Sequence, residues 1–147
     1  KVAVLFIDVD DFKFINDRFG HSVGDEVIKY VAGCIKQRVK GSGFAGRFGG
    51  DEFVLCITDP KQIEEIESLS LDLIDELYEG YHSELANVSI NVKASIGIAF
   101  YPEHGDDSNK VVAAADEAMY FVKKNGKANY HIYQPEDSEM EDLQHTL

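Results

Sequence analysis

Hydrophobic residues in the first part of the chain follow a strand period and then a helix period. Residues 2–7 form an apolar, β-rich run, which is typical of a strand covered on both faces. Apolar residues then recur at helical spacing over residues 12–19, up to Gly20, and this spacing predicts a short helix. A second helix, with its apolar side chains on one face, is predicted from about residue 25 to residue 38.

The middle of the chain has the pattern of a hairpin followed by a long helix. Residues 44–48 and 52–58 are strand-like, and the Gly-Gly pair between them favours a tight turn. The Asp-Pro pair at residues 59–60 is predicted to cap a long helix whose inward positions run from Ile63 to Tyr81.

The last part of the chain predicts a strand, a helix and a short strand. Apolar residues alternate without a miss from Val88 to Phe100, which indicates one long strand with one buried face. Its polar face would include Lys93 and Ser95. A helix is expected near residues 109–124 and a closing strand near residues 130–133.

The order of these elements, βααββαβαβ, predicts an α+β domain with a ferredoxin-like, mixed and largely antiparallel sheet flanked by helices. Right-handed crossovers make the first and second strands parallel, with the third strand antiparallel between them. Asp8 at the end of the first strand would then meet Asp51 and Glu52 at the hairpin tip. The last helix would end at the same edge and bring the lysines within residues 123–127 toward these carboxylates.

Length and charge limit the function classes. With 147 residues, 44% of them apolar, the chain fits one domain with its own core. A net charge of -13 repels phosphate backbones and anionic lipids, so we expect no nucleic-acid binding and no membrane contact. A small anionic ligand would need a metal ion or a local group of lysines. The two cysteines show no metal-binding spacing and suit a reducing cytoplasm.

Two interpretations compete for the acids that follow the two glycines. The plain one is a solvated hairpin tip, because acidic residues favour turns. The other is a metal site, since carboxylates from two segments suit Mg²⁺, or Mn²⁺ in its place. Free amides near Asp11 and Phe12, at the start of the first helix, and the lysines would then hold a nucleoside triphosphate. Taken singly, Asp10 and Asp11 are better explained as caps of the helix, and each lysine as a partner of the helix dipole.

Four segments of the sequence together resemble one known family. "FIDVDDFKFINDRFGHSVGDE", "RFGGDEF", "ASIGIAFYPEHG" and "ADEAMYFVKKNGKANY" are similar, in order and spacing, to the signatures of GGDEF-domain diguanylate cyclases. The likeness runs from Val4 to Tyr133. It implies a palm-type fold, as in nucleotide cyclases, and an enzyme that joins two GTP molecules into cyclic di-GMP with release of two pyrophosphates.

The resemblance assigns roles to the acids at the sheet edge. It implies that Asp8 and Asp51 are metal ligands through their side chains, with the Val9 carbonyl completing the set. Glu52 would be a ligand of a second metal ion or the group that helps to deprotonate the attacking 3′-hydroxyl. Neighbouring residues of a regular strand face opposite ways, so we expect the two glycines to twist this pair into place.

Further residues are implied to bind the nucleotide. Asn16 and Asp25 match the family's guanine-binding positions. A carboxylate can accept from guanine N1–H and the 2-amino group together, and adenine lacks both donors. Lys123 matches a phosphate-binding lysine, and Lys127 stands where an arginine is usual, which keeps the charge but loses the bidentate fork. Lys13 is a further phosphate-binding candidate.

One motif of the family is missing. Many members carry an Arg-x-x-Asp motif, five residues before the signature, that binds product and slows the enzyme. Lys40 and Gly43 occupy these positions here. Because lysine lacks the planar fork and glycine has no acceptor, we predict that this chain has no inhibitory product site.

The resemblance also predicts the setting of the domain. Residues 1–134 would form the GGDEF domain without the family's usual preceding helix and turn, and residues 135–147 an acidic tail or linker. We expect flanking sensory or phosphodiesterase domains. We also expect a cytoplasmic location, which would hold equally for the cytoplasmic domain of a larger, membrane-attached protein. Turnover would need a homodimer with one GTP in each subunit. The alternatives are a GTP-binding regulatory module without turnover and an inert dimerisation domain.

Overall fold

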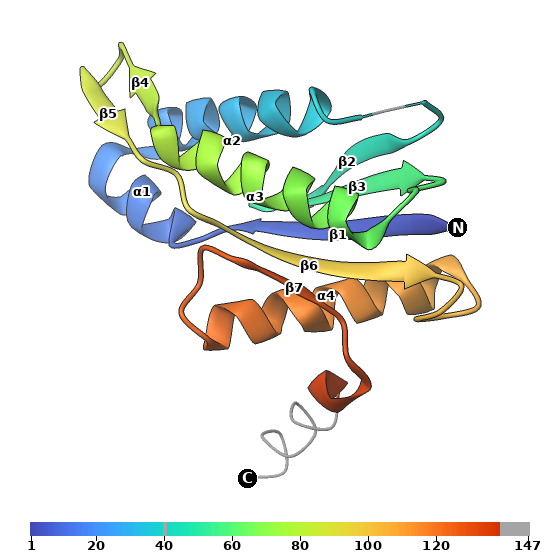
Figure 1. Cartoon of the computed structure of the whole chain (residues 1–147). Coiled ribbons are helices and arrows are strands. Elements are labelled where there is room, and N and C mark those ends of the chain that lie inside the picture. Colours follow the sequence, from blue (N-terminus) through green and yellow to red (C-terminus); the bar gives the residue numbers. More distant parts are fainter. Residues whose placement is uncertain (40, 139–147) are drawn as a thin grey trace, which may run out of the picture.

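A computed structural model describes residues 1–39 and 41–138 (Figure 1). It consists of β1 (Val2–Val9), α1 (Phe12–Phe19), α2 (His21–Lys36), β2 (Phe44–Gly49), β3 (Glu52–Thr58), α3 (Ile63–Glu79), β4 (Tyr81–Ser83), β5 (Val88–Ile90), β6 (Ala94–Tyr101), α4 (Ser108–Lys124) and β7 (Tyr130–Ile132). The predicted α+β class and the order of the main elements are confirmed.

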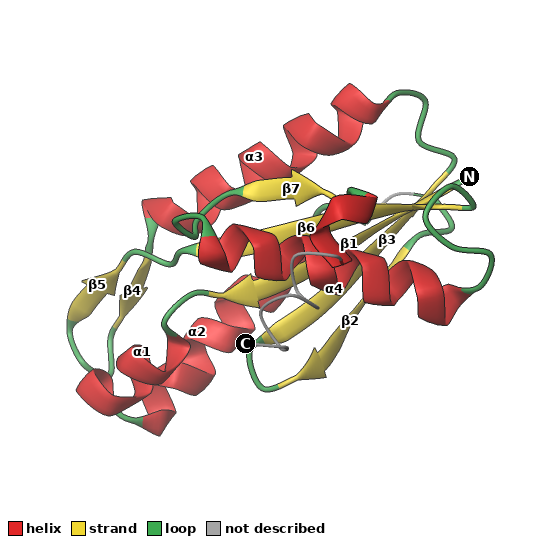
Figure 2. Cartoon of the chain, turned by 90° about the horizontal axis from the view of Figure 1, so that it is seen from below, coloured by secondary structure: helices red, strands yellow, loops and turns green. Residues whose placement is uncertain are grey.

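The main sheet has five strands in the order β2-β3-β1-β6-β7 (Figure 2). β3 lies between β1 and β2 and is antiparallel to both, so β1 and β2 are parallel, as predicted. β6 is antiparallel to β1, and β7 is parallel to β6. The carboxyl end of β1 therefore meets the start of β3, with Asp8 directly opposite Glu52.

The two faces of the sheet are covered by different helices. α2 and α3 lie on one face and α4 on the other (Figure 1). Because side chains alternate along a strand, Leu5 and Ile7 of β1 join the core beneath α2 and α3, whereas Val4 and Phe6 join the smaller core beneath α4. The same period places Asp8 on the α4 face, together with its cross-strand partner Glu52.

The prediction of one long strand over residues 88–100 is wrong. β5 pairs with β4 in a separate two-stranded sheet, and the chain leaves both sheets before β6 begins. The backbone between them turns to other partners: the Val92 amide donates to Leu77 O, and the Lys93 carbonyl accepts from the Asp10 amide. β6 is a central strand covered on both faces, so Ser95, expected on a polar face, is fully buried.

Two helix boundaries differ from the sequence prediction. α2 begins at His21, because Gly20, at φ 93°, turns the chain directly from α1 into α2. α3 is preceded by Gln62 as its N-cap rather than by the Asp-Pro pair, and Tyr81 lies in β4. A helical turn covers residues 135–138, and the rest of the expected acidic tail, residues 139–147, lies outside the described residues.

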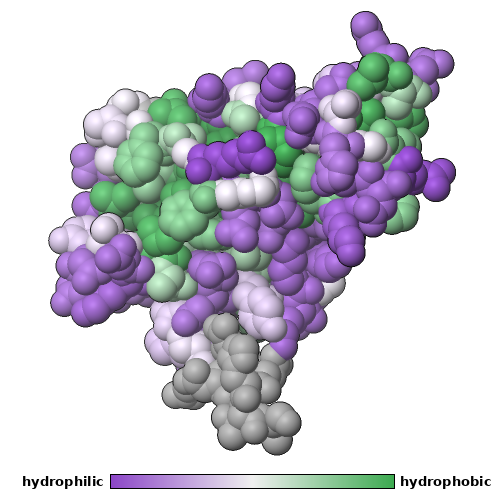
Figure 3. Space-filling model, turned by 180° about the vertical axis from the view of Figure 1, so that it is seen from behind, coloured by the Kyte–Doolittle hydropathy of each residue, from purple (hydrophilic) through white to green (hydrophobic). Residues whose placement is uncertain are grey.

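α4 covers only part of its face of the sheet. It lies so close to β6 at Gly97 that a Cβ there would be 2.0 Å from the carbonyl oxygen of Ala115. Beside it an apolar groove of about 810 Å³ runs over β1, β3 and β2, and Phe44 and Phe48 stand exposed at its border. Apolar residues gather on this side of the molecule when it is seen from behind (Figure 3).

Within residues 1–39 and 41–138, none of the helices has both the length and the apolar character that crossing a membrane requires.

Candidate active site

Three carboxylates converge where β1 ends and β3 begins. Single oxygen atoms of Asp8, Asp51 and Glu52 all lie within 4.8 Å of one another. Asp8 and Glu52 are a cross-strand pair and face the same side of the sheet, and the Val9 amide donates to Asp51 O at 3.1 Å. The predicted meeting of residues more than forty positions apart is confirmed.

The hairpin places both acids by leaving the regular ladder. Phe53 pairs with Arg47 but Glu52 pairs with Gly49, so the strand register shifts by one residue at a β-bulge. Asp51 lies in the turn and is not bound by the strand's alternation. The expectation that the turn takes this pair out of strand alternation is met, although neither glycine has a positive φ.

The hairpin tip is held by side-chain hydrogen bonds, and its two glycines have free space beside them. Arg47 donates from Nε and Nη2 to Gly50 O at 2.9 and 2.5 Å, so it anchors the turn. A Cβ at Gly49 or Gly50 would meet no heavy atom within 4 Å. The backbone there is open to a close-approaching ligand.

Asp8 fits a cation ligand. Its Oδ1 is buried and has no hydrogen-bond partner within the described residues, and Lys123 Nζ lies 3.7 Å away. Burial raises the pKa of Asp8 to about 7, Lys123 opposes this rise, and Asp51 and Glu52 add to it. A buried carboxylate oxygen that accepts no hydrogen bond, beside two more carboxylates, has the hard donor set that Mg²⁺ or Mn²⁺ prefers.

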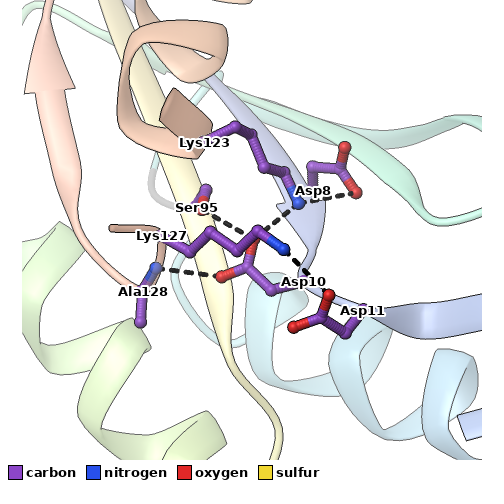
Figure 4. Close-up of polar contacts among 7 residues, drawn as sticks. All are labelled: Asp8, Asp10, Asp11, Ser95, Lys123, Lys127 and Ala128. Atoms are coloured by element: carbon purple, nitrogen blue, oxygen red, sulfur yellow. Dashed lines mark hydrogen bonds and ion pairs between the residues drawn. The ribbon is translucent and has the colours of Figure 1, made fainter. Parts of the chain in front are cut away.

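Asp10, which the sequence suggested only as a helix cap, is the central residue of a buried network that the sequence prediction missed (Figure 4). Its fully buried side chain accepts from Ser95 Oγ at 2.7 Å, Lys123 Nζ at 2.5 Å and the Ala128 amide at 2.9 Å. The spacing of two residues from Asp8 could have revealed it, because a strand places such residues on one face.

The lysines after α4 differ in what they reach. Lys127 Nζ contacts Asp11 Oδ1 at 2.8 Å, and this hydrogen bond raises the pKa of Lys127 and lowers that of Asp11. Lys123 forms an ion pair with Asp10, so two lysines contact acidic residues at this edge of the sheet, as predicted. Lys124 instead lies over the Tyr120 ring, 4.8 Å from its centroid.

The start of α1 and the start of α2 lie together. A Cβ on Gly24 would be 1.8 Å from Asn16 Oδ1 and 3.3 Å from Phe12 Cζ, so the missing side chain makes room for Asn16. The Asn16 side chain therefore packs against Gly24, the residue before Asp25. Asp25 itself is exposed on α2. At α1, the first amide to bond back is that of Phe14, so the amides of Phe12 and Lys13 precede the helix's own bonding.

Glu52 lies in an environment that favours its protonated form. Burial raises the pKa of Glu52, and the neighbouring Asp116 and Asp51 raise it further, against the opposite effect of Lys123. A carboxylate with a raised pKa is a stronger base than an ordinary one.

The raised pKa of Asp8 predicts that metal binding depends on pH. Between about pH 4 and pH 7 the folded protein holds a proton on Asp8 that the unfolded chain has lost, so without metal the unfolding free energy falls as pH rises through this window. A bound metal displaces that proton, and its affinity therefore rises with pH. Thermal unfolding with EDTA and with Mn²⁺ should give a larger metal-dependent shift at pH 8 than at pH 6. An equal shift at both values would contradict this assignment.

Comparison with known proteins gives a matching family model and similar sequences. The family model described as "Diguanylate cyclase, GGDEF domain" matches residues 1–129. The bifunctional diguanylate cyclase/cyclic di-GMP phosphodiesterase MucR of Pseudomonas aeruginosa is 35% identical over 91% of this chain, which spans only 19% of that protein.

Solved structures show the same fold. The GGDEF domain of TpbB from Pseudomonas aeruginosa has a TM-score of 0.91 at 31% identity, with 96% of this chain and 81% of that chain covered. The GGDEF domain of DgcB from Caulobacter crescentus, in complex with c-di-GMP, has a TM-score of 0.82 at 27% identity, with 89% and 77% covered.

Proposed function

This chain belongs to the GGDEF domain family, and on that premise we propose that it is a diguanylate cyclase, which condenses two GTP molecules into cyclic di-GMP with release of two pyrophosphates. The observation that carries the proposal is the convergence of Asp8, Asp51 and Glu52 beside Lys123 and Lys127. Carboxylates for a cation next to lysines for phosphates are what phosphoryl transfer to a nucleotide requires.

In each of two equal steps, the 3′-hydroxyl oxygen of one GTP forms a bond to the α-phosphorus of the other, and the bond from that phosphorus to pyrophosphate breaks. Glu52 is the candidate to take the hydroxyl proton, in keeping with its raised pKa. Lys123, Lys127 and Lys13 neutralise the triphosphate, and the amides of Phe12 and Lys13 bind its oxygens. Lys127 is shared with Asp11, so phosphate binding competes with that ion pair.

The carboxylates of Asp8, Asp51 and Glu52, with the Val9 carbonyl, would hold Mg²⁺ or Mn²⁺, which supplies charge neutralisation for the transferring phosphoryl group. Asn16 and Asp25 would select guanine. Two domains must face each other for both steps, so we propose a homodimer as the active form. Sensory or phosphodiesterase domains would flank residues 1–134 in the full-length protein, which we place in the cytoplasm.

Incubation with GTP and Mg²⁺ tests the proposal. We expect a product that coelutes with cyclic di-GMP on chromatography, together with pyrophosphate, and no product after addition of EDTA. GTP binding without turnover would instead favour a regulatory module.

We further predict that turnover is not slowed by its product. Of the four positions that replace the inhibitory motif, Lys40 lies outside the described residues, and Ser42 Oγ is 2.9 Å from Thr58 Oγ1, within a link to the hairpin. Initial rates should stay nearly flat as cyclic di-GMP is added. Potent non-competitive inhibition would contradict the prediction.

A further inference from the structure

We infer that Asp10 is a positioning residue, which sets the place of the lysines that face the triphosphate without touching the nucleotide itself. The inference rests on the proposed function, since it gives Asp10 a role at the same site. Its side chain is fully buried and lies close to Lys123 and Asp8, between β1, β6 and the end of α4 (Figure 4).

Lys123 is held in place at the end of α4. Its side chain is only 20% exposed, and its Nζ is held by Asp10 Oδ1 at 2.5 Å, while Asp8 Oδ1 is 3.7 Å away. A lysine side chain has four rotatable bonds and no preferred direction of its own. The short contact to a carboxylate that cannot move therefore fixes the ammonium beside the metal ligands.

Asp10 itself is held on both of its carboxylate oxygens. Oδ1 accepts from Ser95 Oγ as well as from Lys123, and Oδ2 accepts from the Ala128 amide. Ser95 lies on the central strand β6 and is fully buried. Because this carboxylate is fixed from two sides, it determines where the flexible Lys123 side chain places its ammonium group.

The turn after α4 has an unusual backbone conformation. Gly126, Lys127 and Ala128 have φ values of 109°, 63° and 51°, a run of left-handed backbone that non-glycine residues adopt only when their surroundings enforce it. Asp10 holds this turn through the Ala128 amide, and the adjacent Asp11 holds Lys127. Asp10 thus sets Lys123 directly and Lys127 through the backbone.

Asp10→Asn tests the inference with the least change in shape. The amide oxygen can still accept from the Ala128 amide, and the Ser95 hydroxyl can rotate to accept from the new NH₂ group. Only the contact to Lys123 has no substitute, because two donors then face each other. We expect the variant to fold and to lose its hold on Lys123.

The readout is binding rather than turnover. Titration calorimetry with Mg²⁺ and the α,β-methylene analogue of GTP, which cannot lose pyrophosphate, should show about 10-fold weaker binding for Asp10→Asn, as is typical for loss of a residue that orients a binding group. GMP, which lacks the two outer phosphates, should bind the variant and the unmodified protein equally. A general loss of structure would weaken both ligands.

A double-mutant cycle identifies the partner. In the Lys123→Met background, Asp10→Asn should weaken analogue binding by far less than in the unmodified protein, since the side chain that it positions is gone. Asp137→Asn is the matched control: its carboxylate is also buried, at 5% exposure, and holds His131 away from the site, so analogue binding should not change.

The possible failures can be told apart. If the unmodified protein does not bind the analogue, the proposed function is wrong and the inference falls with it. If it binds and folded Asp10→Asn binds equally well, the inference alone is wrong. Should Asp10→Asn not fold, Ser95→Ala, which removes one donor to the same oxygen, must weaken the analogue but not GMP; unchanged analogue binding would overturn the inference.

Discussion

Replacement of Asp51 by alanine should abolish cyclic di-GMP formation and leave the protein folded. Asp51 offers an oxygen within 4.8 Å of those of Asp8 and Glu52, and its loss removes one of three carboxylates available to a cation. We expect the rate to fall by about 10³-fold, the upper end of the loss found when a charge-stabilising group is removed from an active site. The measurement is product formed from GTP under saturating Mg²⁺.

Stability should not follow activity in this variant. Asp51 lies in a turn outside the core, and its charge raises the pKa of Asp8, so its removal relieves repulsion within the folded state. Without metal, the melting temperature of Asp51→Ala should equal or exceed that of the unmodified protein. Asp106→Ala, an exposed acid in the loop at the other end of β6, is the control for a general charge effect. Full activity of Asp51→Ala, with unchanged metal dependence, would refute the metal site.

The second large effect concerns the base of the nucleotide. A site that hydrogen-bonds one base rejects the other by up to about 10⁴-fold, because buried polar groups are left unpaired. We expect such a preference for GTP over ATP in kcat/KM. Asp25→Ala should erode it, since we propose this carboxylate as the acceptor for both guanine donors. Asp17→Ala removes an exposed acid next to Asn16 and should leave the preference intact.

Gly24→Ala tests the same guanine assignment without removing a polar group. The added Cβ would take the space of Asn16 Oδ1, 1.8 Å away, so the Asn16 side chain must turn out of its position. The preference for GTP should therefore fall, and the loss should appear mainly in KM. Equal use of ATP and GTP by the unmodified protein would contradict the guanine assignment altogether.

The hydrophobic periodicity of the sequence was enough to predict most of the helices and strands, because burial of one face of an element produces that periodicity directly. Runs at helical spacing located α1 and α4 to within a residue, and the hairpin followed from the glycines between two strand-like runs. Alternation could not locate the break between β5 and β6. The pattern records only which side chains are buried, and Val92 is buried beside α3, outside both sheets, just as it would be within a strand.

The candidate site divides in the same way. Residue types and spacing, with the crossover rule, were enough to predict that Asp8, Asp51 and Glu52 lie close together. They also predicted that Lys123 and Lys127 lie near these acids. Only the tertiary structure decided how they are held: the bulge that frees Asp51 from strand alternation, the room that Gly24 leaves for Asn16, and the burial of Asp10 among three donors. The burial of Asp10 depends on contacts between the end of β1, β6, α4 and the turn after α4, which lie up to about 120 positions apart, and no local pattern encodes their side-chain geometry.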